Sequence, residues 1–269
     1  MTDIERSCVQ ITAGPLNFLE SWVPVELDST QHLFSPENRY KTNLIRRSIQ
    51  IRSICTEEKM KIILIGPQGS GKGTYAELIT KEYKIPTITM GRLLRQLAKT
   101  EKYKYLQEDY MSKGILVPDK LTIEILKERI KKEDCQKGFI LDGFPRTKNQ
   151  AEQLDKITDI DLAIYIDISD ETAIKRLSSR RQCEKCGKIY NIITNPPPKE
   201  NQCECGGKLY IREDDKPEAI KQRLNIFHNQ TKEVIDFYRE KQVLQKVNGE
   251  PDIQAVFKEI DNIINIKNK

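Results

Sequence analysis

The feature that most constrains the fold is an apolar run that leads into a glycine-rich loop at residues 62–74. Four consecutive Ile and Leu residues at 62–65 are typical of a strand that is buried on both faces. The loop has the spacing Gly-x-x-x-x-Gly-Lys, in which glycines let several backbone N–H groups approach one phosphate. A helix expected at 72–84 would direct its positive end at the same phosphate. The stretch therefore predicts a P-loop with Lys72 as its mobile cation.

Strands and helices alternate in the sequence beyond Met60. We expect strands at 61–65, 85–88, 139–142, 162–168 and 243–247, with a helix after each of the first four. A closing helix is expected at 252–266, because apolar residues recur there at helical spacing. Asp119 is expected to cap the N-terminus of a further helix. This alternation predicts a three-layer α/β/α fold with a parallel sheet between two layers of helices.

Composition limits the class of protein. Charged residues make up 32% of the 269 residues and hydrophobic ones 38%, which suits a globular protein with an apolar core. No apolar run approaches the roughly 18 residues of a membrane span, and the acidic N-terminal segment lacks the features of a targeting peptide. We therefore expect a cytoplasmic protein with no membrane partner. The net charge of +5 suits anionic nucleotides, but it does not by itself indicate nucleic-acid binding.

Residues 1–59 differ in character from the remainder. They include Trp22 and His32, and their short apolar patches follow no sustained period. Met60 stands directly before the P-loop strand, where a nucleotide-binding domain could begin. Three interpretations of this N-terminal extension stay open: a docking arm, an accessory mini-domain, or the product of an upstream start codon.

Four of the seven cysteines fall in one short segment, at Cys183, Cys186, Cys203 and Cys205. This two-plus-two spacing suits a tetrahedral zinc site, and each pair is followed by a glycine that allows a turn around the metal. A zinc ion with four thiolate ligands has no open position, so we expect a structural role. The odd number of cysteines in a chain expected to be cytoplasmic argues against a disulfide framework.

A second turn with candidate site residues follows the strand expected at 139–142, and it reads Asp-Gly-Phe-Pro-Arg-Thr. An acid at the carboxyl end of a parallel strand lies in the crevice where such sheets bind ligands. Asp142 can therefore hold the water shell of a magnesium ion beside the P-loop. The turn also presents Arg146, whose planar guanidinium suits phosphate oxygens.

Gly73 occupies the position where most P-loops carry the Ser or Thr that ligates magnesium, and Thr74 comes one residue late. This loop and the turn at 142–147 resemble the nucleoside monophosphate kinases, adenylate kinase above all. The resemblance covers residues 60–269 and implies reversible phosphoryl transfer from MgATP to AMP, which gives two ADP. It also implies three parts: a core at 60–88, 118–180 and 217–269, a helical monophosphate-binding insertion at 89–117, and a zinc-ribbon-like lid at 181–216.

The same resemblance assigns site residues, which we list by role. The ATP site comprises Gly69, Ser70, Gly71, Lys72, Gly73, Thr74, Arg176, Arg180, Ile189 and Tyr190. The AMP site comprises Met90, Gly91, Arg95, Ile115, Leu116, Val117, Gly143, Phe144, Pro145, Arg146, Gln150, Arg212 and Arg223. The catalytic set comprises Lys72, Asp142, Arg146, Arg180, Arg212 and Arg223, and Asp214 and Asp215 are expected to anchor the lid.

Three features depart from the family pattern. Met90 replaces the hydroxyl residue that commonly touches the base, and Arg92 replaces the acid expected to help order the water around magnesium. The change at Arg92 puts a positive charge beside a dication, so metal affinity and turnover are in doubt. The second cysteine pair is Cys-x-Cys rather than Cys-x2-Cys, and we expect zinc with a distorted second turn.

Three alternatives stay open at this point. Met90 makes a kinase for UMP or CMP conceivable, although Thr147 and Gln150 favour AMP. A zinc ribbon on a P-loop protein could bind RNA, but charges of both signs alternate along the ribbon, so no nucleic-acid partner is expected. Arg92 and the extension are also compatible with a nucleotide-regulated scaffold with weak catalysis. We expect a monomer whose ligands are ATP and AMP or ADP.

Overall fold

The structure is a computed structural model that describes residues 59–267. The three interpretations of the N-terminal extension concern residues outside this range, apart from Lys59. Five parallel strands form the central sheet in the order β2-β3-β1-β4-β8. These strands are β1 (Met60–Ile65), β2 (Thr87–Thr89), β3 (Gly138–Asp142), β4 (Leu162–Asp167) and β8 (Leu244–Asn248). All five strands expected from the sequence are confirmed, with ends shifted by up to two residues.

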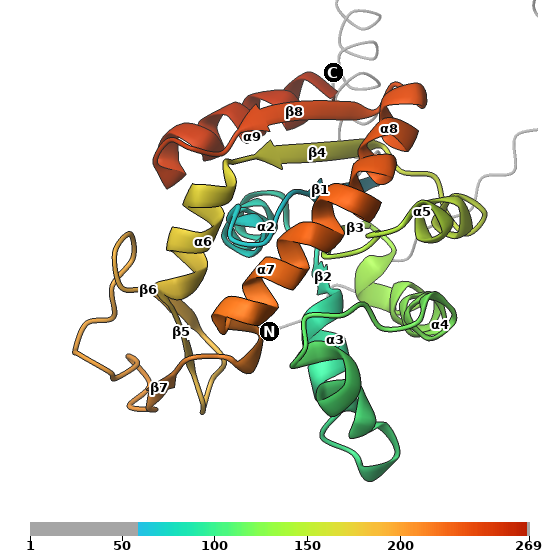
Figure 1. Ribbon diagram of the computed structural model, residues 1–269. Helices are drawn as coiled ribbons and strands as arrows, with labels where there is room; N and C mark the ends of the chain where they lie inside the picture. The colour runs from blue at the N-terminus through green and yellow to red at the C-terminus, as the bar shows by residue number, and fades with distance from the viewer. Residues whose placement is uncertain (1–58, 268–269) are drawn as a thin grey trace, which may run out of the picture. The chain divides into compact units, whose positions relative to one another are not determined.

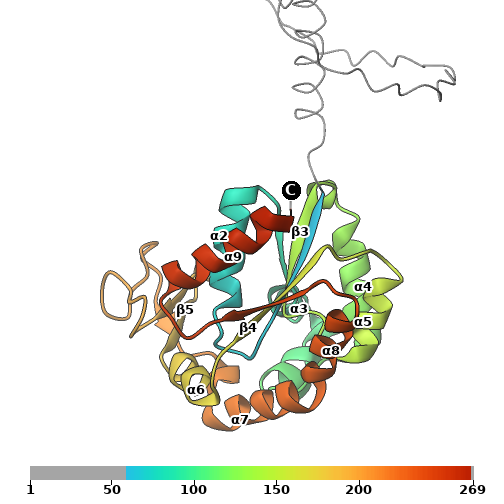
Figure 2. The ribbon, with the colours of Figure 1, turned by 90° about the horizontal axis from the view of Figure 1, so that it is seen from above.

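Helices cover both faces of this sheet (Figures 1 and 2). The α-helices are α2 (Lys72–Tyr83), α3 (Met90–Leu97), α4 (Asp119–Ile130), α5 (Lys148–Asp155), α6 (Asp170–Ser178), α7 (Pro217–Ile226), α8 (Lys232–Glu240) and α9 (Ile253–Lys267). Helices α2 and α9 pack on one face, and α4, α5 and α8 pack on the other. The predicted three-layer α/β/α fold is therefore confirmed. Among the described residues, none of the helices combines the length and the apolar character needed to span a bilayer.

The apolar run of β1 packs against the helices on both faces of the sheet. Ile62 and Leu64 belong to the cluster with α2 and α9, whereas Ile63 and Ile65 belong to the cluster with α4, α5 and α8. Successive side chains of a strand point to opposite faces, so a strand covered on both sides needs an apolar residue at every position. The carboxyl end of β1 leads directly into the P-loop.

Two helix ends differ in how they are capped. The prediction that Asp119 caps α4 is wrong, because Pro118 is the capping residue and Asp119 is the first residue of the helix. The Asp119 carboxylate instead accepts hydrogen bonds from Asn149 and Gln150 of α5 and from Thr147, the residue before α5. Asp252 does cap α9, since its Oδ1 accepts from the backbone N–H groups of Gln254 and Ala255 at 2.9 and 3.0 Å.

Two segments extend from the core. The first, between β2 and α4, contains α3, the 3-10 turn η1 (Glu101–Tyr103) and the π-helical turn η2 (Leu106–Met111). The second lies beyond α6 and forms an antiparallel sheet in the order β6-β5-β7, away from the parallel sheet (Figure 1). Its strands are β5 (Arg180–Cys183), β6 (Ile189–Asn191) and β7 (Leu209–Tyr210). Three further turns are η3 (Glu133–Cys135), η4 (Glu213–Asp215) and the π-helical η5 (Phe227–Thr231).

Candidate active site

One cleft of about 1590 Å³ opens at the carboxyl ends of the parallel strands and continues between the two extending segments. The nucleotide-site residues predicted from the sequence all line this cleft, with the exception of Ser70. Ser70 is fully buried, and its Oγ lies 3.3 Å from the Lys72 Nζ. The fold thus brings residues from widely separated parts of the sequence to one surface.

The P-loop forms one end of the cleft. Gly69 and Gly71 both have φ of 89°, a conformation that glycine adopts without strain, and a Cβ at Gly71 would lie 2.8 Å from the Tyr75 ring. The Lys72 ammonium donates to the carbonyls of Gly66 and Pro67, each at 2.8 Å. Desolvation lowers the pKa of Lys72 to about 7, although Asp142 opposes this shift. The loop carbonyls therefore position the Lys72 ammonium at the cleft, where it can bind an anion.

Asp142 ends β3 beside the start of α2. It pairs in register with Thr89 of β2, and a Cβ at Gly73 would lie 3.8 Å from its Oδ2. The absence of a side chain at Gly73 therefore leaves the carboxylate close to the N-terminus of α2. Asp142 and the exposed Thr74 are the oxygen donors available here for a magnesium ion, which prefers such ligands.

The turn after β3 orders Arg146. The Arg146 Nε donates to the Gly143 carbonyl at 3.0 Å, and the Phe144–Pro145 peptide is cis. Burial lowers the pKa of Arg146, while Asp142 opposes the shift. Arg146 therefore offers its remaining N–H groups to the cleft from a fixed position.

Arg95 projects from α3 toward the same space. Its guanidinium lies over Gly91, where an added Cβ would be 3.5 Å from both terminal nitrogens. Burial and the neighbouring Arg212 lower the pKa of Arg95 to about 10. Met90, the first residue of α3, is buried and Arg92 is exposed, and both line the cleft. Gly91 therefore gives Arg95 room to reach an anion in the cleft.

Three arginines near the antiparallel sheet are held by two aspartates. The Arg180 Nε donates to Asp215 at 2.7 Å, and the Arg212 Nε donates to Asp214 at 2.7 Å. Arg223 donates to the Asp214 carbonyl at 2.7 Å. Burial raises the pKa of Asp214, but Arg212 and Arg223 outweigh that effect and hold it well below its usual range. Burial also lowers the pKa of Arg223 to about 9. The network keeps three cations beside the cleft in one arrangement.

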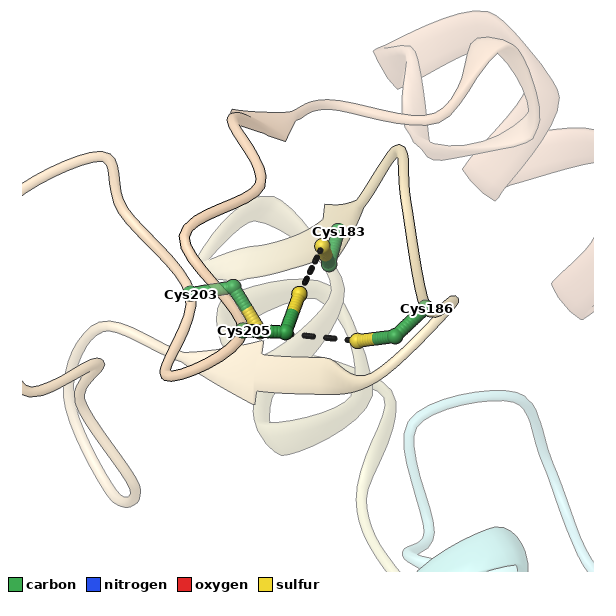
Figure 3. Close-up of side chains that lie close together, drawn as sticks. All are labelled: Cys183, Cys186, Cys203 and Cys205. Carbon is green, nitrogen blue, oxygen red and sulfur yellow. Dashed lines mark hydrogen bonds between the residues drawn. The ribbon is translucent and has the colours of Figure 1, made fainter.

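The four clustered cysteines point toward one another at the end of the antiparallel sheet (Figure 3). Their Sγ atoms all lie within 4.8 Å of one another, and the pairs Cys183–Cys205 and Cys186–Cys203 are 3.5 Å apart. A zinc tetrahedron with Zn–S bonds of about 2.3 Å has S–S edges of about 3.8 Å. The donor set and its spacing therefore fit a zinc ion, including at the shortened Cys-x-Cys pair.

Two neighbours of the cluster support this fit. A Cβ at Gly207 would lie 2.6 Å from the Cys183 Sγ, so only glycine lets the chain pass this close. The Tyr190 hydroxyl lies 3.3 Å from the Cys203 Sγ and lowers the pKa of that thiol to about 6. Tyr190 is therefore turned toward the cysteines, while its neighbour Ile189 is exposed and lines the cleft.

The comparisons with known proteins agree with this geometry. The family model for adenylate kinase matches residues 64–243. An adenylate kinase of Caldicellulosiruptor bescii is 45% identical over 215 residues, covering 77% of this chain and all of that protein. Adenylate kinases of Archaeoglobus fulgidus and Bacillus cytotoxicus are 44% and 46% identical over 212 residues, with 76% of this chain and 98% of each relative covered. The chain belongs to the adenylate kinase family.

This member of the adenylate kinase family contains site contacts that sequence reasoning missed. Gly114 has φ of 71°, and a Cβ there would lie 2.8 Å from the Ala219 carbonyl and 2.9 Å from the Arg223 Cγ. The segment between β2 and α4 therefore packs directly against α7, the helix that carries Arg223. Thr231 in η5 donates through its Oγ1 to the Arg146 carbonyl at 3.0 Å. The isolated Gly114 could have indicated the close approach to α7, whereas no local sequence pattern predicts the contact of Thr231 with Arg146.

Arg176 also makes contacts within the protein that the sequence did not predict. Its guanidinium donates to the carbonyls of Gly249 and Glu250 at 3.0 and 3.3 Å. It therefore ties α6 to the loop before α9 while it lines the cleft. The structure adds this contact to the nucleotide contact that the resemblance implies.

Proposed function

We propose that the chain catalyses reversible phosphoryl transfer between MgATP and AMP, with two ADP as products. The observation that carries this assignment is a single cleft with two separate sets of phosphate donors. The P-loop with Lys72 forms one set, and Arg95 of α3 and Arg146 of the turn after β3 form the other. A P-loop protein that hydrolyses one nucleotide needs only the first set, whereas transfer between two nucleotides needs both.

The chemistry requires positioning and charge neutralisation rather than covalent participation by the protein. Lys72 and the loop N–H groups are proposed to hold the donor phosphates, and Arg95 and Arg146 the acceptor phosphate. Adenylate kinases use Mg²⁺ with ATP, and we assign its water shell to Asp142 and Thr74. A phosphate acceptor is already ionised near pH 7, so no general base is required.

Arg180, Arg212 and Arg223 are proposed to complete the charge cage around the transferring group. Their present partners, Asp214 and Asp215, are carboxylates, which offer the same kind of oxygen acceptors as a phosphate. When a nucleotide enters, each guanidinium can keep one carboxylate contact and turn its other N–H groups to phosphate. This preorganisation limits the reorganisation that the cage needs at the moment of transfer.

We further propose that the insertion at 89–117 and the lid at 181–216 close over the two nucleotides and exclude water. Zinc held by Cys183, Cys186, Cys203 and Cys205 would be structural, because four thiolates leave no open ligand position. The roles of the ATP-site and AMP-site residues named from the sequence, the cytoplasmic location and the monomeric state also stay proposals.

An assay of ADP formation tests this assignment. ATP is supplied with AMP, GMP, CMP or UMP, using both the full chain and a chain that begins at Met60. We expect ADP from AMP with both chains and much slower reaction with the other three nucleotides. Arg95→Met should raise the KM for AMP at least tenfold, while Arg239→Met, on the exposed side of α8, should leave it unchanged. No ADP from either chain would overturn the assignment, and faster use of UMP or CMP would replace AMP as the acceptor.

A further inference from the structure

We propose that Asp119 is a specificity-determining positioning residue, which locks the side-chain amide of Gln150 in the orientation that accepts adenine and rejects guanine. The inference rests on the proposed function, because it takes Gln150 to face the base of the acceptor monophosphate. Gln150 lies on the first turn of α5, is 2% exposed, and forms part of the cleft wall. Asp119 does not line the cleft, so it acts through Gln150.

Two unlike partners fix the Gln150 amide. The Arg146 backbone N–H donates to its Oε1 at 2.7 Å, and its Nε2 donates to the Asp119 Oδ1 at 2.6 Å. The two ends of an amide have nearly the same shape, but a backbone N–H can only donate and a carboxylate can only accept. The reverse orientation would place N–H against N–H and oxygen against oxygen. The amide therefore has one permitted orientation.

Asp119 is itself held firmly. Its Oδ2 accepts from the Thr147 Oγ1 at 3.0 Å and from the Asn149 Nδ2 at 2.8 Å. It is also the first residue of α4. These contacts tie α4 to the start of α5 and leave the Oδ1 directed at Gln150.

The locked amide keeps one N–H and one lone pair for a ligand. Its second N–H has only a long contact, 3.4 Å, to the Thr122 Oγ1, and the Oε1 has one acceptor position beyond the Arg146 contact. Adenine offers the complementary pair, a 6-amino donor and the N1 acceptor. Guanine offers the reverse pair, an O6 acceptor and an N1–H donor. Because Arg95 and Arg146 would fix the phosphate and hence the direction of the base, a locked amide distinguishes the two.

The test measures kcat/KM for AMP and for GMP with saturating ATP. Asp119→Ala removes the acceptor that holds the Nε2 end of the amide and leaves only the Arg146 N–H to orient it. We expect the AMP/GMP ratio to fall about tenfold or more, as the loss of a charge-assisted hydrogen bond implies. The change should appear in the KM for AMP, with the KM for ATP unaltered. Asn149→Ala is the matched control, since it removes another donor to the same carboxylate but leaves both Gln150 contacts in place. Its ratio should stay within about twofold of the starting value.

Asp119→Asn provides a second variant if Asp119→Ala does not fold. It keeps the size and one acceptor oxygen but lacks the charge, so a smaller fall in the AMP/GMP ratio is expected. Calorimetry measures the dissociation constants of AMP and GMP, and their ratio should change in the same direction without turnover. A merely structural role would slow both nucleotides equally, and an unchanged ratio in the folded variants overturns the inference while leaving AMP kinase activity intact. A starting protein that forms no ADP from AMP overturns both the inference and the proposed function.

Discussion

The antiparallel sheet, which we propose to be the lid, and the parallel-sheet core are stabilised by different means. The core has two clusters of buried apolar side chains, one on each face of the sheet. The lid cluster consists of four buried residues, Cys183, Tyr190, Cys203 and Leu209, and two of these are candidate zinc ligands. A three-stranded sheet with so little apolar burial needs another source of stability. We therefore expect a metal to stabilise the lid, whereas apolar burial stabilises the core.

The same contrast applies to the charges that face the cleft. On the core side, Lys72 is held by loop carbonyls and has no carboxylate within ion-pair distance among the described residues. On the lid side, Arg180, Arg212 and Arg223 are paired with Asp214 and Asp215. The P-loop thus offers a cation without an ion-pair partner, whereas the three arginines around Asp214 and Asp215 are already paired. Removing charge should therefore cost most in the core.

Replacement of the P-loop lysine is expected to have the largest effect on activity. Lys72→Met should lower kcat/KM for ADP formation about 1000-fold, because a fixed cation at the donor phosphates is lost. The melting temperature of the lid and its metal content should not change. Lys81→Met, on the exposed last turn of the same helix, is the control and should retain full activity. A loss below tenfold for Lys72→Met would mean that Arg180, Arg212 and Arg223 carry the catalysis.

Metal removal is expected to have the next largest effect, and it should act on the lid alone. Chelation, or Cys203→Ser, should release about one zinc per chain and lower kcat about 100-fold, since the arginine cage is no longer ordered over the phosphates. The melting transition of the core should shift by only a few degrees. Loss of the whole fold on chelation would contradict the division between the two regions.

A cysteine outside the cluster gives the matched comparison for metal removal. Cys135 is buried in the core, and burial raises the pKa of its thiol. Cys135→Ser should cost only about 1 kcal/mol of core stability, because the hydroxyl can keep the contact that the Sγ makes with the Arg129 guanidinium at 2.9 Å. Zinc content should stay the same. Thermal melting and metal analysis of the two Cys→Ser variants separate the two regions directly.

The features that could be predicted from sequence are those with a local pattern. The apolar run at 62–65 predicted a strand buried on both faces, and the glycine spacing after it predicted a phosphate-binding loop. About a dozen residues were therefore enough to predict β1 and the P-loop. The four cysteines were predicted as a cluster because metal ligands have few permitted spacings. The family resemblance then supplied the second nucleotide site.

The features that could not be predicted join residues that are distant in the sequence. Aspartate is a residue type that often caps helices, but the Asp119 carboxylate accepts hydrogen bonds from residues about 30 positions away. Thr231 reaches the Arg146 carbonyl across 85 positions. Such contacts depend on how helices pack on the sheet, and a single sequence carries no periodic signal for them. The contact of the Tyr190 hydroxyl with the Cys203 Sγ was likewise not predicted.

The lowered pKa of Lys72 predicts a pH effect confined to the core side. Its pKa is about 7 in the free protein, and donor phosphates should raise it. Below pH 7 the lysine is already protonated, so binding takes up no proton. Above pH 7 binding must take up one proton, and the affinity for ATP should fall about tenfold per pH unit. Calorimetry in buffers of different ionisation enthalpy measures this uptake, which should be absent in Lys72→Met.

The smallest expected effect concerns Arg92, an exposed cation of α3 on the cleft wall. Arg92→Asp changes the local charge by two units, so the magnesium concentration for half-maximal activity should fall about threefold at low salt. Because the side chain is exposed, the shift should shrink as ionic strength rises. Lys102→Asp makes the same change of charge outside the cleft and should leave the requirement unaltered. If Arg92→Asp instead raises the magnesium requirement, the arginine itself neutralises phosphate charge, and the insertion then contributes a fixed cation as the P-loop does.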